Sequence, residues 1–149
     1  MFYIGIDPGG QGGFAIINGD DNSAEVMSWD QELFINKIKD MHAAGLPCIT
    51  CLENVHAMPS DSRKRAFAFG ESLGFIKGVL QSFDIPYQLI SPVKWKKEFN
   101  LIKQDKSVSI QTCKQLYPTV SLKRTPKCTK DSDGMAEALL MATYAKRKF

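Results

Sequence analysis

The sequence FYIGIDPGGQGGFAIIN, residues 2–18, predicts two strands joined by a tight turn. Apolar and β-branched residues fill 2–6, Pro8 and the glycines after it break the pattern, and 14–18 resumes an extended apolar run. The first strand ends on an acid, Asp7. Because an ionised carboxylate is costly to bury, this position indicates that a cation compensates for its charge.

A second strand pattern also ends on a carboxylate. The apolar run 48–52 is followed by Glu53 and then by a loop, residues 54–62. Two strands that end in acids can bring both carboxylates to one edge of a sheet.

A third acidic position lies in the segment 131–148, whose Ala, Leu and Met content predicts a C-terminal helix. Asp133 and Glu137 are four residues apart, so they project from one helix face, within roughly 40° of each other. Asp131 points away from that face. It stays an alternative to Asp133, because sequence defines a helix start only to within a few residues.

The order of the expected elements predicts an α/β protein. Three extended runs, 2–7, 14–18 and 24–29, predict an antiparallel meander. The other expected elements are strands at 48–53 and 87–90 and helices at 31–44, 65–83, 93–98, 106–117 and 131–148. This order is typical of a ribonuclease H-like fold, a mixed five-stranded sheet flanked by helices. The length of 149 residues predicts one domain, 1–149.

Five short motifs follow one another along the chain: Ile4–Gly9, Leu52–Val55, Gly70–Gly74, Ser91–Lys97 and Asp133–Ala142. In this order they resemble RuvC-type Holliday junction resolvases, and the resemblance covers essentially the whole chain. Small size and departures from the cellular enzymes are typical of a phage-type member.

The resemblance implies a structure-selective endonuclease. It would resolve four-way junctions as a homodimer, with paired nicks, and could also cut other branched DNA. Asp7 would bridge two Mg²⁺ ions, which Mn²⁺ could replace, Glu53 would bind one ion, and Asp133 with Glu137 would complete the other. Cellular members usually carry two aspartates three apart in the last helix, whereas this chain has Asp and Glu four apart.

The resemblance also implies residues that contact DNA: His56, Arg63, Lys64, Arg65, Lys96 and Lys106. His56 stands where the family places an aromatic that stacks on bases, and the two last lysines match family lysines that contact the DNA backbone. The alternative is that these are solvated surface residues. Trp95, between lysines, either stacks on a base or is buried in a short amphipathic helix.

Charge distribution, hydropathy and cysteine positions give further expectations about the class of protein. The net charge is only +3, but the cations cluster in islands suited to DNA phosphates. No signal pattern and no apolar run of about 18 residues is found, so we expect a soluble cytoplasmic protein of a bacterial host, with no membrane and no evident protein partner. Strand alternation puts Cys48 and Cys51 on opposite faces, which favours reduced structural thiols over zinc.

Other interpretations remain for the carboxylates and for the protein. Asp7 could cap the glycine turn, Asp133 could be a helix N-cap, and Glu137 could pair with a lysine. The protein could bind branched DNA with weak or absent nuclease activity. An ATP-handling protein of the actin and Hsp70 fold group needs two such domains, and the YqgF-like nuclease branch fits the Glu53 loop and the last helix less well.

Overall fold

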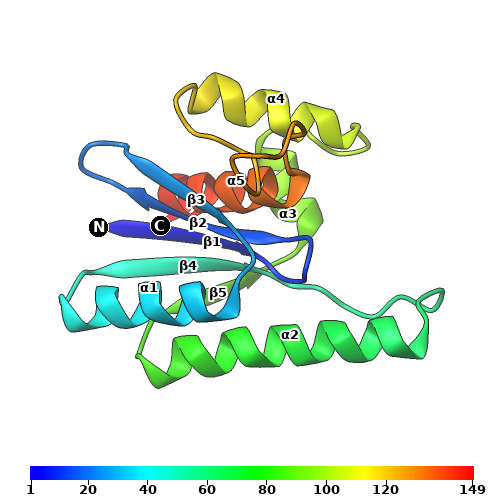
Figure 1. The fold of residues 1–149 in the computed structure, drawn as a ribbon, viewed down its shortest axis with the longest axis horizontal. Helices are drawn as coiled ribbons and strands as arrows, with labels where there is room; N and C mark the ends of the chain where they lie inside the picture. The colour runs from blue at the N-terminus through cyan, green and yellow to red at the C-terminus, as the bar shows by residue number, and fades with distance from the viewer.

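Five strands form one mixed sheet in the computed structural model, which describes residues 1–149 (Figure 1). The strands are β1 (Phe2–Asp7), β2 (Gly13–Asn18), β3 (Ala24–Ser28), β4 (Cys48–Glu53) and β5 (Tyr87–Ile90). Their order across the sheet is β3-β2-β1-β4-β5. β1 pairs antiparallel with β2 and β2 with β3, whereas β4 runs parallel to both β1 and β5.

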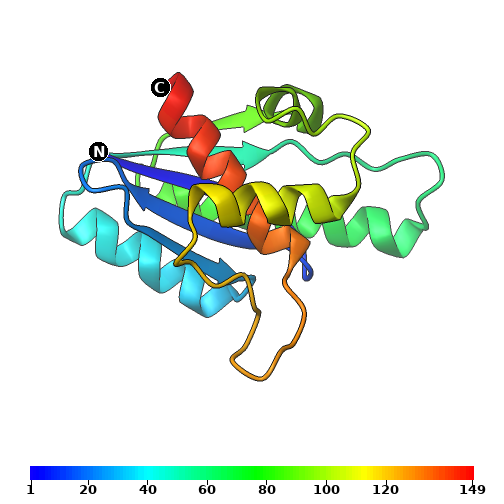
Figure 2. The same cartoon turned by 90° about the horizontal axis from the view of Figure 1, so that it is seen from above.

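Helices cover both faces of the sheet. They are α1 (Gln31–Ala43), α2 (Arg63–Ser82), α3 (Pro92–Glu98), α4 (Lys106–Leu116) and α5 (Asp133–Lys148). α1 and α2 lie on one face, and α3, α4 and α5 lie on the other (Figures 1 and 2). These elements confirm the predicted α/β fold with a mixed five-stranded sheet flanked by helices. None of the helices combines the length and the apolar character needed to cross a membrane.

The alternation of side chains along each strand divides the core into two layers. Ile4 and Ile6 pack in one cluster with residues of α1 and α2, whereas Ile17 packs in the other with residues of α5. Cys48 and Cys51 of β4 fall in different layers, and all four cysteines are free. The expected placement of these two thiols on opposite faces is therefore confirmed.

α5 lies unusually close to β1 and to the turn that follows it. A Cβ at Gly5 would overlap the backbone of Ala138 and Ala142, and a Cβ at Gly134 would overlap the backbone of Gln11. Because these two glycines have no side chain, residues 138–142 of α5 pack directly against β1, and the first turn of α5 packs directly against the turn after β1. This contact fixes the position of α5 relative to β1, and therefore the position of the Glu137 side chain.

Serine caps decide where two helices begin. Ser132 is the N-cap of α5, since its hydroxyl accepts a hydrogen bond from the Met135 N–H at 3.3 Å. The expected start at 131 is two residues early, and the alternative role of Asp133 as the N-cap is wrong. Ser62 caps α2 in the same way, so this helix starts at Arg63 rather than at 65 as expected.

The contact between α5 and β1 can be tested with Gly5→Ala. The added methyl group would meet backbone rather than a movable side chain, so we expect the free energy of unfolding to fall by about 1–3 kcal/mol or more. Gly78→Ala is the matched control: Gly78 lies in the interior of α2 with open space around it, where alanine should stabilise by about 0.5–1 kcal/mol. Urea unfolding of both variants measures the difference, and equal effects would contradict the close contact.

Candidate metal centre

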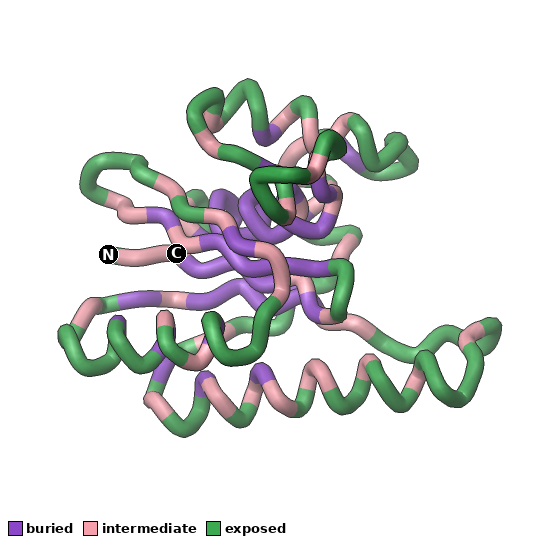
Figure 3. The backbone as a smooth tube through the Cα atoms, viewed as in Figure 1, coloured by how far each residue is buried: buried purple, intermediate pink, exposed green.

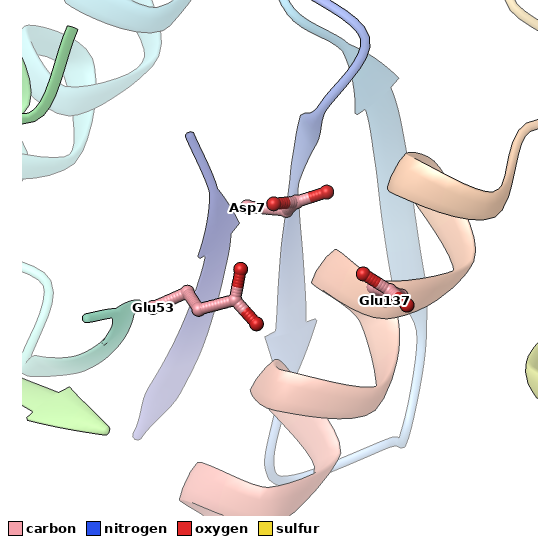
Figure 4. A group of neighbouring side chains, drawn as sticks. All are labelled: Asp7, Glu53 and Glu137. Carbon is pink, nitrogen blue, oxygen red and sulfur yellow. The ribbon is translucent and has the colours of Figure 1, made fainter. Parts of the chain in front are cut away.

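Two strand ends and one helix bring three carboxylates together. Asp7 ends β1 and Glu53 ends β4, and because these strands are parallel neighbours with Ile6 opposite Leu52, the two acids leave the sheet at the same edge. Glu137 faces them from α5 (Figure 4). One ligand oxygen from each of the three side chains lies within 4.8 Å of the other two.

The three carboxylates are crowded in a poorly solvated place. Glu53 is only 7% exposed, and Asp7 and Glu137 are half-buried. Burial raises the pKa of Asp7 well above its ordinary value of 3.8, and the charges of Glu53 and Glu137 raise it further. Burial also raises the pKa of Glu137, where the Glu53 charge adds to the effect and Lys96 opposes it. The cluster therefore resists full ionisation unless a cation is added.

The chemistry of the cluster fits a hard divalent cation. All three donors are carboxylate oxygens, with no thiol or imidazole among them, which is the ligand set that Mg²⁺ and Mn²⁺ prefer. Neither Asp7 nor Glu53 has a lysine or arginine within salt-bridge distance; the lysines nearby pair with the two acids of α5. The positive charge that would balance Asp7 and Glu53 is thus not supplied by the protein.

Asp133, the fourth expected ligand, lies at the rim of this cluster. Its charge contributes to the raised pKa of Asp7, but it is not among the three acids that meet within 4.8 Å. Asp133 is the first residue of α5, one turn before Glu137, and its side chain is 38% exposed. The structure therefore brings three of the four expected carboxylates together and keeps the fourth one turn outward.

Asp131, the alternative to Asp133, is directed elsewhere. Its carboxylate lies 2.5 Å from the Lys114 ammonium on α4. This ion pair holds Asp131 beyond the N-cap of α5, so it takes no place in the cluster.

Two of the expected DNA-binding lysines contact the acids of α5. Lys106 Nζ lies 2.6 Å from Asp133 Oδ2, and Lys96 Nζ lies 3.4 Å from Glu137 Oε1. Burial raises the pKa of Asp133, but the hydrogen bond and charge of Lys106 outweigh that effect and lower it overall. The alternative interpretation of Glu137 as a lysine partner is thus correct, although the same carboxylate also faces Asp7 and Glu53.

The carboxylates line one wall of a cleft of about 660 Å³, and residues of α2 line the other wall. Arg65 reaches this cleft, with its guanidinium 5.3 Å from the centre of the Phe69 ring and 3.4 Å from Asp61. Lys106 also lines the cleft, whereas His56, Arg63 and Lys64 are exposed. They lie on the loop after β4 and at the start of α2, a largely exposed stretch of the chain (Figure 3). Of the six expected DNA-binding residues, Arg65, Lys96 and Lys106 therefore lie at the cleft or contact an acid of the site, and the other three do not line the cleft.

Sequence reasoning missed two polar contacts near the cluster. Trp95 is buried and its indole N–H donates to Glu53 Oε1 at 3.0 Å, and the Arg124 guanidinium donates to the carbonyl oxygens of Gly10 and Gln11 in the turn after β1. A signal for the first existed, because a buried tryptophan needs an acceptor for its N–H. No local pattern pointed to the second, which joins residues more than a hundred positions apart.

Comparison with known proteins identifies the fold. No family model matches the sequence, and no curated protein matches it. Among solved structures, the chain is similar to Thermus thermophilus RuvC, with 18% identity, a TM-score of 0.58, and coverage of 99% of this chain and 96% of that chain. It is similar to T. thermophilus RuvC in complex with Holliday junction substrate over the same shares, with 18% identity and a TM-score of 0.60.

A more distant structure has the same architecture. The yeast mitochondrial Holliday junction resolvase Ydc2 is 14% identical, with a TM-score of 0.54, and the match covers 97% of this chain and 77% of that chain. At these identities the likeness defines the fold. The chain has the RuvC-type, ribonuclease H-like fold, as its motifs predicted.

The charge crowding can be tested with Asp7→Asn. An acid whose pKa is raised in the folded state stabilises that state at pH values below its unfolded-state pKa. For Asp7 this stabilisation is lost as the pH rises above the unfolded-state pKa of 3.8 and through the raised pKa of the folded state. We therefore expect Asp7→Asn to raise the free energy of unfolding of the metal-free protein at pH 8, by about 1.4 kcal/mol for each pKa unit of displacement. The gain should shrink at pH 5.

Urea unfolding with chelator at pH 5 and pH 8 measures this effect. Mg²⁺ or Mn²⁺ should stabilise the wild type more than Asp7→Asn. If Asp7→Asn is less stable than the wild type at pH 8, the negative charge of Asp7 does not destabilise the folded protein and the prediction is wrong.

Proposed function

We propose that this protein is a structure-selective DNA endonuclease that resolves four-way junctions by metal-dependent phosphodiester hydrolysis. The observation that carries the proposal is the convergence of Asp7, Glu53 and Glu137 within 4.8 Å, in a cleft that Arg65 and Lys106 also line. The fold supports it, because the structure of T. thermophilus RuvC with Holliday junction substrate matches 99% of this chain. The proposed substrate is branched DNA, with four-way junctions preferred.

Each acidic residue has a role in this proposal. An oxygen of Asp7 lies within 4.8 Å of an oxygen of Glu53 and of an oxygen of Glu137, so Asp7 could share a bound ion with either acid. Asp133 would join as a fourth ligand after releasing Lys106. When bound, Mg²⁺ or Mn²⁺, in two sites, would supply Lewis-acid activation of water and neutralise charge on the departing oxygen.

The cations around the cleft fit the phosphate backbone of DNA. Lys106 lines the cleft with its side chain 76% exposed, and Arg65 faces it from α2. Lysine and arginine contacts with phosphates supply most of the sequence-independent affinity for DNA. His56 would reach bases at the junction centre, since it is exposed on the loop that leaves Glu53.

We infer that a homodimer acts on the junction. Two strands must be cut, and one chain offers one carboxylate cluster. The first half of α2 extends beyond the sheet, and its Phe67 is 73% exposed, so this helix offers an apolar surface to a second copy (Figure 1). The Asp and Glu four residues apart in α5, with histidine at position 56, support a phage-type member. We propose that it acts in the cytoplasm of a bacterial host.

The activity is tested with a labelled synthetic four-way junction and a matched linear duplex. We expect paired nicks in the junction with Mg²⁺ or Mn²⁺, none with chelator, and none from Asp7→Asn. Asp7→Asn should still bind the junction, at wild-type affinity or tighter, because one carboxylate that repels phosphate is gone.

Tight junction binding by the wild type without nicks under either metal would contradict the endonuclease proposal. It would favour a branched-DNA-binding protein. The observation consistent with that outcome is the Lys106–Asp133 ion pair, which occupies the fourth expected ligand.

The DNA path is tested by the salt dependence of junction binding. Lys106→Ala should weaken binding equally across junction sequences and flatten the plot of log affinity against log salt by about one unit, because one phosphate contact is lost. Lys39→Ala is the control: Lys39 is exposed on α1, which covers the opposite face of the sheet. Equal slopes for the Lys106 variant and the wild type would remove Lys106 from the interface.

A further inference from the structure

Trp95 joins the buried core directly to the carboxylate cluster. Its side chain is 0% exposed, within the layer that separates the sheet from α5. The indole N–H donates to Glu53 Oε1 at 3.0 Å, and it is the one N–H group that donates to this carboxylate. An indole is a donor only, so in this bond the N–H donates and the Glu53 oxygen accepts.

The chain path explains how Trp95 reaches Glu53. β5 ends at Ile90, which pairs with Glu53 in the sheet, and the Asn54 N–H bonds to the Ile90 carbonyl at 2.9 Å. Ser91 then caps α3, whose first helical residue is Pro92. α3 therefore begins beside the end of β4, and the indole of its fourth residue, Trp95, reaches the Glu53 carboxylate.

Burial makes the two partners depend on each other. An indole N–H without an acceptor is costly in an apolar layer, and so is a carboxylate without donors. Glu53 has no lysine or arginine within salt-bridge distance, so the Trp95 indole is the one N–H group available to restrict its side chain. A free glutamate side chain would instead distribute over several rotamers.

The next residue of α3 contacts the cluster from the helix side. Lys96 Nζ lies 3.4 Å from Glu137 Oε1 and 5.2 Å from the centre of the Trp95 ring. Trp95 and Lys96, adjacent residues of α3, thus contact the carboxylate of Glu53 on β4 and the carboxylate of Glu137 on α5. Through these two contacts α3 connects the two elements that carry the acids.

We propose that Trp95 is a positioning residue that orients the Glu53 carboxylate for divalent cation binding. This inference rests on the proposed function for its biological purpose, but it concerns cation affinity and can be measured without DNA. Loss of a hydrogen bond that orients a metal ligand commonly costs 10- to 100-fold in metal affinity. Trp95→Phe keeps an aromatic ring in the core and removes the N–H.

The test compares Mn²⁺ affinity of three proteins by calorimetry and by the electron paramagnetic resonance signal of free Mn²⁺. We expect Trp95→Phe to bind Mn²⁺ about 10-fold more weakly than the wild type. Tyr117→Phe is the matched control, because it also removes one hydrogen bond from this layer, the 3.0 Å contact with Thr143, without touching a carboxylate. It should bind Mn²⁺ with wild-type affinity.

The indole resonances provide a second readout that does not require Trp95→Phe to fold. The chain has two tryptophans, so the wild type gives two indole N–H signals, and Trp29→Phe identifies the one from Trp95. Mg²⁺ should shift the Trp95 signal in the wild type, and this shift should be lost in Glu53→Gln. A Trp95 signal that stays fixed at saturating Mg²⁺ would overturn the proposal.

The outcomes separate this inference from the endonuclease proposal. Equal Mn²⁺ affinity of the wild type and folded Trp95→Phe overturns the role of Trp95, whether or not the protein cuts junctions. Weakened Mn²⁺ binding in Trp95→Phe alone supports the role of Trp95, even if the wild type binds junctions without nicking them.

Discussion

The contact between α5 and β1 is the constraint on which the rest of the site depends. Gly5 and Gly134 leave no side chain between the helix and the strand, so their backbones meet directly. This close packing places Glu137 opposite Asp7. One oxygen from each of Asp7, Glu53 and Glu137 then lies within 4.8 Å of the other two. A larger side chain at either glycine would move α5 outward. The carboxylates would then separate, because a helix moves as a rigid unit.

The site also shows how a protein holds like charges together before a cation arrives. Lys96 and Lys106 pair with the two acids of α5, and Trp95 donates to Glu53, which leaves Asp7 with the raised pKa that burial and its neighbours impose. The lysines therefore balance the negative charge of the α5 acids but not that of Asp7. Carboxylate oxygens whose charge the protein does not balance attract divalent cations. We therefore expect ionised Asp7 to lower the stability of the metal-free protein.

Much of the fold could be predicted from local patterns. β4 and β5 occupy the expected residues 48–53 and 87–90, because apolar alternation between turn residues is a local property. Errors occur at helix starts, where Ser62 and Ser132 act as caps. The candidate site was predicted in the same way for Asp7 and Glu53, since each ends a strand. The outward position of Asp133 could not be predicted, because it depends on how far α5 tilts over β1 and on the reach of Lys106 from α4.

The sequence predicts the strands and helices to within a few residues, their order, and the acids at strand ends and on one helix face. These features follow from side-chain periodicity, which acts over a few residues. Packing of distant segments is needed to bring three of the acids together, to pair Lys106 with the fourth, and to place Trp95 against Glu53, 42 positions away. Such contacts depend on how closely the backbones pack, and that is set by the whole core rather than by neighbouring residues.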